Sequence, residues 1–424
     1  MKKILIISPH FPPSNLAAVH RSRLFAQHLP AFGWSPVILM VDEQCYEEKL
    51  DHNLAKLLPA DLKIEKVKAL GVTKPRVLGD VGLRGFFQLY KRAKKIIKEQ
   101  KIDFLYIPIP SFYVALLGRW LHASTGVQYG IDYIDPWVHH FAGSDKMFSR
   151  HWFSTELSKF LEPIAIKKAS LITGVAEGYY EGVKKRNPHL LQQAVFAAMP
   201  YGGEKRDHEQ LKELRLKPYL FQKKAGKIQL MYAGAMLPKA YQPLEAILLA
   251  IKEHREVFKD LEIHFIGTGK SPNDKNGFNI KPFAEKYGLW EEVIFEYPAR
   301  IPYLEVLIHL EAADGVFILG STEPHYTPSK VYQGVLSKKA IWAILHSQSS
   351  ACKVIRASRA GIVLDFNGEC EVEKVHSSFV ENYKEYMQFL KCFDYHQVNQ
   401  EAFDKYSARE VTRTLADSLD LIIH

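Results

Sequence analysis

The segment ADGVFILGSTEPHYTPSKVYQGVLSKKAIWAI, residues 313–344, decides the fold. It contains an apolar run from Asp314, a polar loop, a helical pattern that begins near Pro328, and a second apolar run from Ala340. A proline at the start of a helix, with Thr327 as its N-cap, suits the middle of this segment. Strands that are apolar on both faces and joined by a helix indicate a parallel sheet.

The same alternation of short apolar runs and amphipathic patterns extends in both directions. The C-terminal half adds strands that begin at Ile228, Leu261, Glu292 and Gly361. The N-terminal half has strands that begin at Lys3, Pro36, Asp103, Val127 and Ser170, with helical patterns over 17–32, 85–99, 113–124 and 153–168. The sequence therefore predicts an α/β protein with doubly wound parallel sheets.

The alternation weakens between residues 199 and 226, where turn residues and charges accumulate. We therefore predict two Rossmann-like domains, residues 1–200 and 201–404, with a terminal helical stretch over 405–424. Ligands bind beyond the carboxyl ends of the strands in such sheets. Two sheets that face each other would form one interdomain cleft, so the residues that directly follow strands are the candidates for a site.

Composition narrows the classes of function. The 424 residues carry a formal net charge of +9, which favours a phosphorylated ligand or an anionic lipid surface, since we find no nucleic-acid-binding module. No apolar run approaches the roughly 20 residues that cross a bilayer. The first run ends at Pro9 and is interpreted as a strand, so we expect a cytoplasmic protein. The four cysteines are scattered without zinc-site spacing: Cys45, Cys352, Cys370 and Cys392.

Polar groups crowd the loop and first helical turn after residue 320. They are Glu323, His325, Tyr326, Thr327, Ser329, Lys330 and Gln333. Unpaired amides with Ser329 and Lys330 suit a diphosphate, whereas Glu323 and Gln333 suit sugar or ribose hydroxyls. The competing interpretation is a capped helix with an exposed polar face.

A second candidate for phosphate binding opens the C-terminal half. In YAGAMLPKAYQ a strand ends at Gly234, and Lys239 lies in the short loop before the next helix. Glycine allows close backbone approach, and a lysine at this place suits a phosphate. A tight turn with a solvated lysine is the alternative. The glycines of FIGTGK, residues 265–270, complete no GxGxxG motif and favour a structural turn.

In the N-terminal half, a predicted strand ends within IDYIDPWVHHF, and the residues after it are Asp135, Trp137, His139 and His140. The carboxylate of Asp135 would face the cleft, and the ring of Trp137 could stack on a sugar. The alternatives are that Asp135 caps the next turn and that Trp137 fills the core. Asp132 and Asp135 are three positions apart and form no DxD motif, so we predict no required metal.

Residues 84–101 form a basic amphipathic pattern. Its apolar stripe is Phe86, Tyr90, Ala93 and Ile97, and a neighbouring face holds Lys91, Lys94, Lys95 and Lys98. Such a surface could rest on anionic lipid headgroups. An ordinary helix that covers the sheet with a solvated basic side is the favoured alternative.

Six segments, in order, resemble retaining glycosyltransferases of the GT-B fold, specifically glycosyltransferase family four. These are SPHFPPSNLAAVHRSRLFAQHLPAFGWSPVIL (8–39), IDYIDPW (131–137), VAEGYYEGVKKR (175–186), MPYGGE (199–204), residues 313–344, and DKYSAREVTRTLADSLDLI (404–422). The sequence departs from the family at three places. His325 and Gln333 stand where relatives have two glutamates, Ala235 replaces an arginine, and residues 15–18 replace a glycine pair.

The resemblance implies transfer of a sugar from a nucleotide-diphosphate sugar to a glycan, lipid-linked or small-molecule acceptor, with retention and without a cofactor, in polysaccharide or glycoconjugate synthesis. Lys239 and Lys330 would neutralise the leaving diphosphate, with Gly234 and the polar loop around the donor. The acceptor would enter near His10, Asp135, Trp137 and His139. The C-terminal helix 405–424 would cross back to the first domain.

Two alternatives remain open at the sequence level. A nicotinamide-dependent oxidoreductase would need a GxGxxG motif and an acidic residue about 20 positions later, and neither is present. A catalytically silent relative that binds a sugar nucleotide or a partner is suggested by the departures at Ala235 and Gln333.

Overall fold

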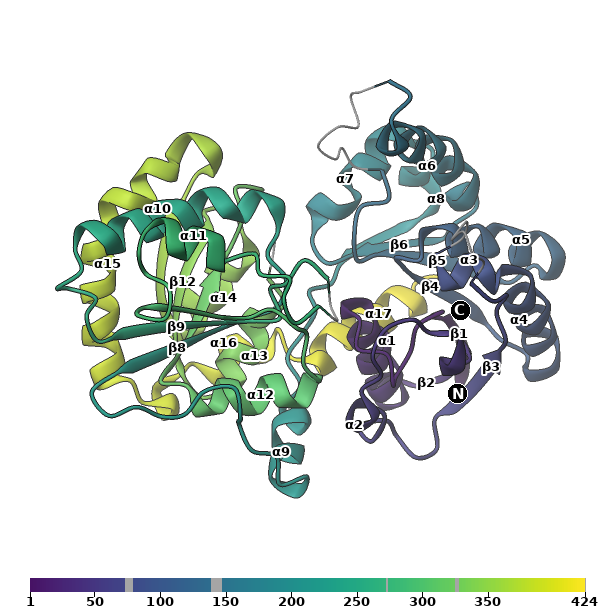
Figure 1. Ribbon diagram of the computed structural model, residues 1–424. Coiled ribbons are helices and arrows are strands. Elements are labelled where there is room, and N and C mark those ends of the chain that lie inside the picture. The colour runs from purple at the N-terminus through teal and green to yellow at the C-terminus, as the bar shows by residue number, and fades with distance from the viewer. Residues whose placement is uncertain (73–78, 139–146, 272–273, 325–327, 424) are drawn as a thin grey trace. The chain divides into compact units, whose positions relative to one another are not determined.

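The computed structural model describes residues 1–72, 79–138, 147–271, 274–324 and 328–423 (Figure 1). The chain divides into two compact units. Unit 1 comprises Met1–Tyr201 and Ala408–His424, and unit 2 comprises Gly202–Ser407. Each unit contains one parallel sheet with helices on its faces.

Unit 1 contains a seven-stranded sheet in the order β3-β2-β1-β4-β5-β6-β7. Its strands are β1 (Lys2–Ile7), β2 (Trp34–Val41), β3 (Lys63–Val67), β4 (Phe104–Ile109), β5 (Gln128–Tyr133), β6 (Leu171–Gly174) and β7 (Val195–Ala198). Chain order reverses between β1 and β4, which is where a doubly wound sheet opens a crevice. Two of these strands, β3 and β7, are not among the predicted ones. Strand β3 reads KIEKV and carries three charged residues, and β7 is a run of only four residues, VFAA, that is partly buried.

Helices cover both faces of this sheet because its strands are apolar on both faces. Leu5 and Ile7 of β1 belong to one apolar cluster, and Ile4 and Ile6 belong to another. The first cluster is covered by α4 (Phe86–Gln100), α5 (Ala115–Thr125), α6 (Arg150–Ile166) and α7 (Glu177–Arg186). The second is covered by α1 (Ala17–His28) and α17 (Ala408–Asp420). The shorter helices are α2 (His52–Ala55), α3 (Val81–Arg84) and α8 (Leu190–Gln193).

Unit 2 contains a six-stranded sheet in the order β10-β9-β8-β11-β12-β13, with the reversal between β8 and β11. Its strands are β8 (Ile228–Ala233), β9 (Leu261–Ile266), β10 (Ile294–Tyr297), β11 (Gly315–Leu319), β12 (Ala340–His346) and β13 (Gly361–Phe366). Its helices are α9 (Lys205–Glu213), α10 (Tyr241–Glu253), α11 (Lys281–Lys286), α12 (Tyr303–Ala312), α13 (Lys330–Leu336), α14 (Ser350–Ser358), α15 (Val372–Cys392) and α16 (Gln400–Asp404).

The helix of the deciding segment is shorter than predicted. It begins at Lys330, and its N-cap residue Ser329 makes no side-chain capping bond. Thr327, the predicted cap, lies outside the described residues. The described residues between β11 and α13, residues 320–324 and 328–329, form loop.

The amphipathic pattern over 84–101 forms α4, and its apolar stripe packs inward. Phe86, Ala93 and Ile97 are buried in the core of unit 1, and Tyr90 packs against that core. The favoured alternative, a helix that covers the sheet, describes this stripe correctly, so the stripe is not a lipid-facing surface.

Candidate functional site

The strand-order reversal of unit 2 brings two predicted phosphate-binding segments together. Gly234 follows β8, and Gly320 to Glu323 follow β11, the next strand across the reversal. The two loops are joined because the Thr322 amide donates to the Lys239 carbonyl oxygen at 3.1 Å. This crevice between β8 and β11 is the place where ligands bind in open α/β sheets.

Lys330 reaches across this crevice from the first position of α13. Its Nζ lies 3.9 Å from the centroid of the Tyr232 ring, near the end of β8. A Cβ at Gly234, which has φ +104°, would lie only 2.8 Å from Lys330 Cε. The glycine predicted for close approach therefore makes room for the lysine side chain.

Among the described residues, the ammonium of Lys330 is buried without a counter-charge. Its Nζ has no hydrogen-bond partner in the described part of the chain, and burial lowers the pKa of Lys330 to about 7. A buried, unpaired cation is costly, and a bound anion would remove that cost. This site is therefore arranged for an anionic ligand.

A second unpaired group lies on the same pair of loops. The Thr322 hydroxyl is buried and makes no hydrogen bond within the described residues. Thr322 is not among the predicted site residues, although its position directly after β11 was a usable signal. A hydroxyl that can donate or accept fits a phosphate or sugar oxygen.

The remaining predicted donor-binding residues of this loop either are partly buried or lie outside the described residues. Glu323 is partly buried, and its backbone amide lies 3.3 Å from the Ser321 hydroxyl oxygen that accepts from it. Ser329 is partly buried at the start of α13. His325, Tyr326 and Thr327 lie outside the described residues.

Lys239 differs from Lys330 in its surroundings. Its side chain is exposed, and its Nζ lies 3.7 Å from Glu369 Oε1. Exposed ion pairs of this kind contribute little, since water screens both charges. The geometry matches the alternative of a solvated lysine in a turn, with its backbone carbonyl bound to Thr322.

Gln333 is engaged inside unit 2. Its Oε1 lies 3.0 Å from His208 Nε2, and His208 Nδ1 lies 3.0 Å from Glu311 Oε1. The carboxylate and imidazole come from α12 and α9. While this chain of hydrogen bonds is formed, the amide oxygen predicted for ribose is occupied by His208.

In unit 1, His10 follows β1 at the strand-order reversal but is paired. Its Nδ1 lies 2.8 Å from Glu48 Oε1, and its ring packs 4.8 Å from that of Tyr46. Burial would raise the pKa of the Glu48 carboxyl, but His10 and the Ser14 hydroxyl outweigh it and lower the pKa to about 2. The His10–Glu48 pair is thus a stable local contact.

The segment after β5 is divided between surface and core. Asp135 is exposed. Trp137 is only 3% exposed and stacks on Phe112 at 6.1 Å, so the expectation that its ring meets a sugar is wrong. The ring fills the core because apolar contacts there remove its surface from water. His139 and His140 lie outside the described residues.

A buried ion pair in unit 1 escaped the sequence analysis. The Arg21 guanidinium donates to both carboxylate oxygens of Asp132, at 2.5 and 3.0 Å, and to the carbonyl oxygens of Met199 and Pro200. Thr173 also donates to Asp132, at 2.8 Å. The signal was a charged residue inside an otherwise apolar strand, β5. This network ties α1 to the sheet.

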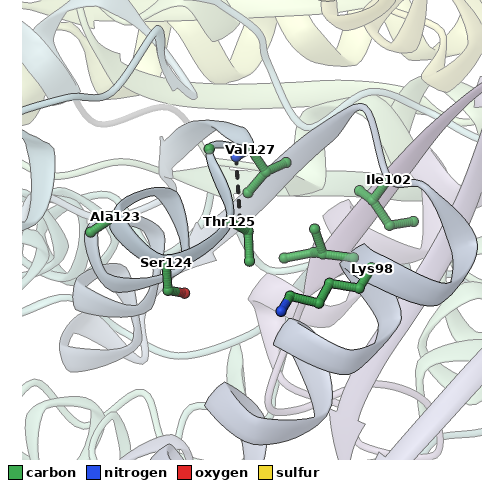
Figure 2. A pocket seen from close by; sticks show the side chains of 8 residues that line it. Lys98, Ile102, Ala123, Ser124, Thr125 and Val127 are labelled. Carbon is green, nitrogen blue, oxygen red and sulfur yellow. Dashed lines mark hydrogen bonds between the residues drawn. The ribbon is translucent and has the colours of Figure 1, made fainter.

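Figure 2 shows a hollow of about 620 Å³ at the C-terminal ends of α4 and α5. Lys98, Ile102 and Thr125 line it, and the Val127 amide donates to the Thr125 hydroxyl at 3.4 Å. This hollow lies by the amino ends of β4 and β5, so it is not the crevice expected from the strand order.

Metal ligands and membrane spans were also sought. The described residues contain no group of three histidine, cysteine or acidic side chains that could hold a metal ion. None of the helices in the described ranges combines the length and apolar character that crossing a bilayer requires.

Comparison with known proteins places this architecture. No family model matches the sequence, and no curated protein matches it. Solved structures match over the whole chain. HepE of Anabaena in complex with UDP aligns with a TM-score of 0.61 at 11% identity, covering 99% of this chain and 100% of that one.

Two further solved structures also align with nearly the whole chain. A glycosyltransferase from Rickettsia africae aligns with a TM-score of 0.59 at 14% identity, covering 99% of this chain and 98% of that one. Sucrose-phosphate synthase of Thermosynechococcus elongatus aligns with a TM-score of 0.64 at 11% identity, covering 100% and 99%. The chain has the GT-B fold. At these identities the likeness establishes the architecture, and membership of family four stays a prediction.

Proposed function

We propose that unit 2 binds a nucleoside-diphosphate sugar at the β8–β11 crevice and that the protein transfers the sugar to an acceptor. The observation that carries the proposal is the buried, unpaired ammonium of Lys330 at the strand-order reversal. The fold is shared with HepE, which has been solved with UDP and with UDP-glucose, and this supports the choice of ligand.

The chemistry of the leaving group gives Lys330 its role. Cleavage of the glycosidic bond to the nucleotide leaves negative charge on the diphosphate. A preorganised cation in a site of low dielectric stabilises that charge without reorganisation. The absence of a side chain at Gly234 leaves room for the Lys330 side chain beside the end of β8, and so keeps the ammonium at the crevice.

The polar loop after β11 would complete the donor site. The Thr322 hydroxyl supplies a hydrogen bond to a phosphate or sugar oxygen, and Glu323 with Ser329 lies on the same loop. His325, Tyr326 and Thr327 belong to this loop by sequence and are assigned to the donor on that ground.

The finer parts of the proposal follow from the resemblance to family four. The acceptor, a glycan or a lipid-linked or small molecule, would bind on unit 1 near His10 and Asp135. Transfer would proceed with retention, without a required metal, in cell-surface polysaccharide or glycoconjugate synthesis in the cytoplasm.

Nucleotide binding tests the first step. Thermal shifts of the full chain with UDP, GDP, ADP and NAD should favour one diphosphate over NAD. Lys330→Met should weaken that binding at least tenfold, because the only buried ammonium at the crevice among the described residues is removed. Lys353→Met, an exposed lysine of α14, is the matched control and should bind like the native protein. Preference for NAD would sink the proposal.

Turnover tests the second step. With the preferred donor, the native protein should release nucleoside diphosphate and transfer sugar, and Lys330→Met should do neither. A second candidate, a silent relative, is favoured by the occupied amide of Gln333 and by Ala235. Binding of the donor with no hydrolysis or transfer across a broad acceptor panel would support the silent relative instead. Isomerisation of the donor would indicate a different reaction.

A further inference from the structure

Helix α6 of unit 1 presents an apolar stripe to solvent. Phe153, Leu157, Phe160 and Ile164 are exposed by 55%, 44%, 67% and 39%. Their spacing of four, three and four residues places them on one face of the helix. Large apolar side chains repeated along one exposed face are unusual for a helix that packs on a sheet, because such helices turn that face inward.

The inward face of α6 is mixed: Leu161, Ala165 and Ile166 pack in the core of unit 1, and polar side chains are buried beside them. Thr155 and Ser158 are buried, and Glu162 is buried with its carboxylate 2.6 Å from Arg186 Nη2 of α7. Burial raises the pKa of Glu162, against the effect of Arg186. The helix thus buries both polar and apolar groups while it leaves four large apolar side chains in water. Contact of that outer face with a partner would remove their surface from water.

Aromatic side chains extend the stripe beyond the N-terminal end of α6. Met147 and Phe148 are both exposed by more than two thirds. The Phe148 ring lies 5.7 Å from that of Trp152, which lies 5.0 Å from that of Phe153. This group provides a cluster of rings of the kind that enters the headgroup region of a bilayer.

Neighbouring helices of the same layer carry further exposed aromatics. Helix α5 packs against both α4 and α6. Trp120 of α5 and Phe87 of α4 are exposed, and both rings contact Phe86. The outer surface of this helical layer (labelled α4, α5 and α6 in Figure 1) is therefore apolar at several places.

The positive charge of the protein is concentrated in the unit that carries the stripe. Unit 1 has 29 lysines and arginines against 20 aspartates and glutamates, whereas unit 2 has 27 of each. The excess of nine, equal to the formal net charge of +9, thus belongs to unit 1. On and after α6, Lys159, Lys167 and Lys168 are exposed, and Glu156 is paired with Lys159 at 2.7 Å.

We propose that the outer face of α6, from Met147 to Ile164, docks unit 1 onto an anionic bilayer surface. Apolar side chains would enter the headgroup and acyl boundary while the lysines beside them meet acidic headgroups. A second copy is a poorer occupant, because two such faces would bring like charges together. The inference does not depend on the function proposed for unit 2.

Vesicle flotation of the full chain tests the proposal. The probes are vesicles of phosphatidylcholine alone and of phosphatidylcholine mixed equally with phosphatidylglycerol. The native protein should float with the anionic vesicles only, and salt should weaken its binding. Phe153→Ser combined with Phe160→Ser should reduce binding at least tenfold, because two large rings no longer leave water. Leu191→Ser, at an exposed apolar position on α8, should bind like the native protein.

Charge is tested by a second pair of variants. Lys159→Glu, Lys167→Glu and Lys168→Glu together should also reduce binding at least tenfold. Lys217→Glu, Lys259→Glu and Lys391→Glu change the net charge equally but lie on unit 2 and should bind like the native protein. Circular dichroism confirms that each variant is folded.

Three outcomes would overturn the proposal: no binding of the native protein to either vesicle, binding unaffected by the changes on α6, or a native dimer in sedimentation velocity that the double phenylalanine variant dissociates while vesicle binding is absent. The last result would assign the stripe to a second copy of the chain.

Discussion

Both units have a doubly wound parallel sheet, but they differ in whether the charged groups near the strand-order reversal have partners. In unit 1 the polar groups near the reversal are paired: His10 with Glu48, and Arg21 with Asp132. In unit 2 the Lys330 ammonium and the Thr322 hydroxyl are buried and unpaired in the described part of the chain. Completed pairs stabilise a fold, whereas unpaired groups are arranged for a ligand.

The distribution of charge between the two units separates two interpretations that the total net charge left open. A charge of +9 favoured a phosphorylated ligand or a lipid surface without distinguishing them. The unit with the candidate nucleotide site is neutral, and the unit with the exposed apolar helix holds the whole excess. A single buried lysine suffices for a diphosphate, since burial rather than total charge strengthens the local interaction.

The largest expected effect on stability comes from breaking the buried ion pair of unit 1, between Arg21 and Asp132. Asp132→Asn should lower the free energy of unfolding by about 3–5 kcal/mol, because Arg21 would remain buried without its anion. Chemical denaturation measures the loss. Glu181→Gln, which removes an exposed ion pair with Lys185, should leave the midpoint unchanged. A native-like midpoint for Asp132→Asn would mean that water, not Asp132, balances the guanidinium.

Removal of the buried charge of unit 2, on Lys330, should increase the stability of the protein rather than decrease it. Lys330→Met should raise the free energy of unfolding of the ligand-free protein by about 1–3 kcal/mol, because an unpaired buried cation is removed. The pKa of Lys330 is lowered from 10.5 to about 7 in the fold, so the native protein bears this cost fully below pH 7 and loses it as the pH approaches 10.5.

The stabilisation by methionine should therefore be greatest below pH 7 and shrink toward pH 10.5. Thermal midpoints across this range check the sign, with Lys353→Met as the control. A destabilised Lys330→Met protein at pH 6 would show that the ammonium has a partner in the free protein.

The smallest expected effect concerns ligand affinity. Below pH 7 the free protein already holds Lys330 charged, whereas above pH 7 binding a diphosphate requires proton uptake. Affinity for the preferred nucleoside diphosphate should fall by up to about tenfold per pH unit from pH 7 to pH 9. Calorimetric titrations measure the slope. The Lys330→Met variant should lose that slope, and an unchanged slope would assign it to another group.

Much of the architecture could be predicted from the sequence, because continuous apolar runs separated by amphipathic patterns leave few alternatives to parallel sheets. The alternation of apolar runs and amphipathic patterns weakens near residue 200, and this interruption predicts two domains. The two edge strands were missed for different reasons: β3 carries charged residues, and β7 is an apolar run of only four residues.

The candidate site was predictable only in part. Lys330 and Gly234 were named as residues that follow strands, and the strand order brings them to one crevice. The sequence could not show that Lys330 is unpaired, that Lys239 is exposed, or that Gln333 is bound to His208, because partners come from distant elements. Trp137 was misjudged for the same reason, since the rings that cover it lie some 25 positions earlier.

By itself, the sequence determined most of the strands and helices, because periodicity and composition are local properties. Only the tertiary structure decided which polar groups are satisfied and which face of α6 points outward. Those properties depend on contacts and burial between residues that are far apart in the chain, and no local pattern encodes them.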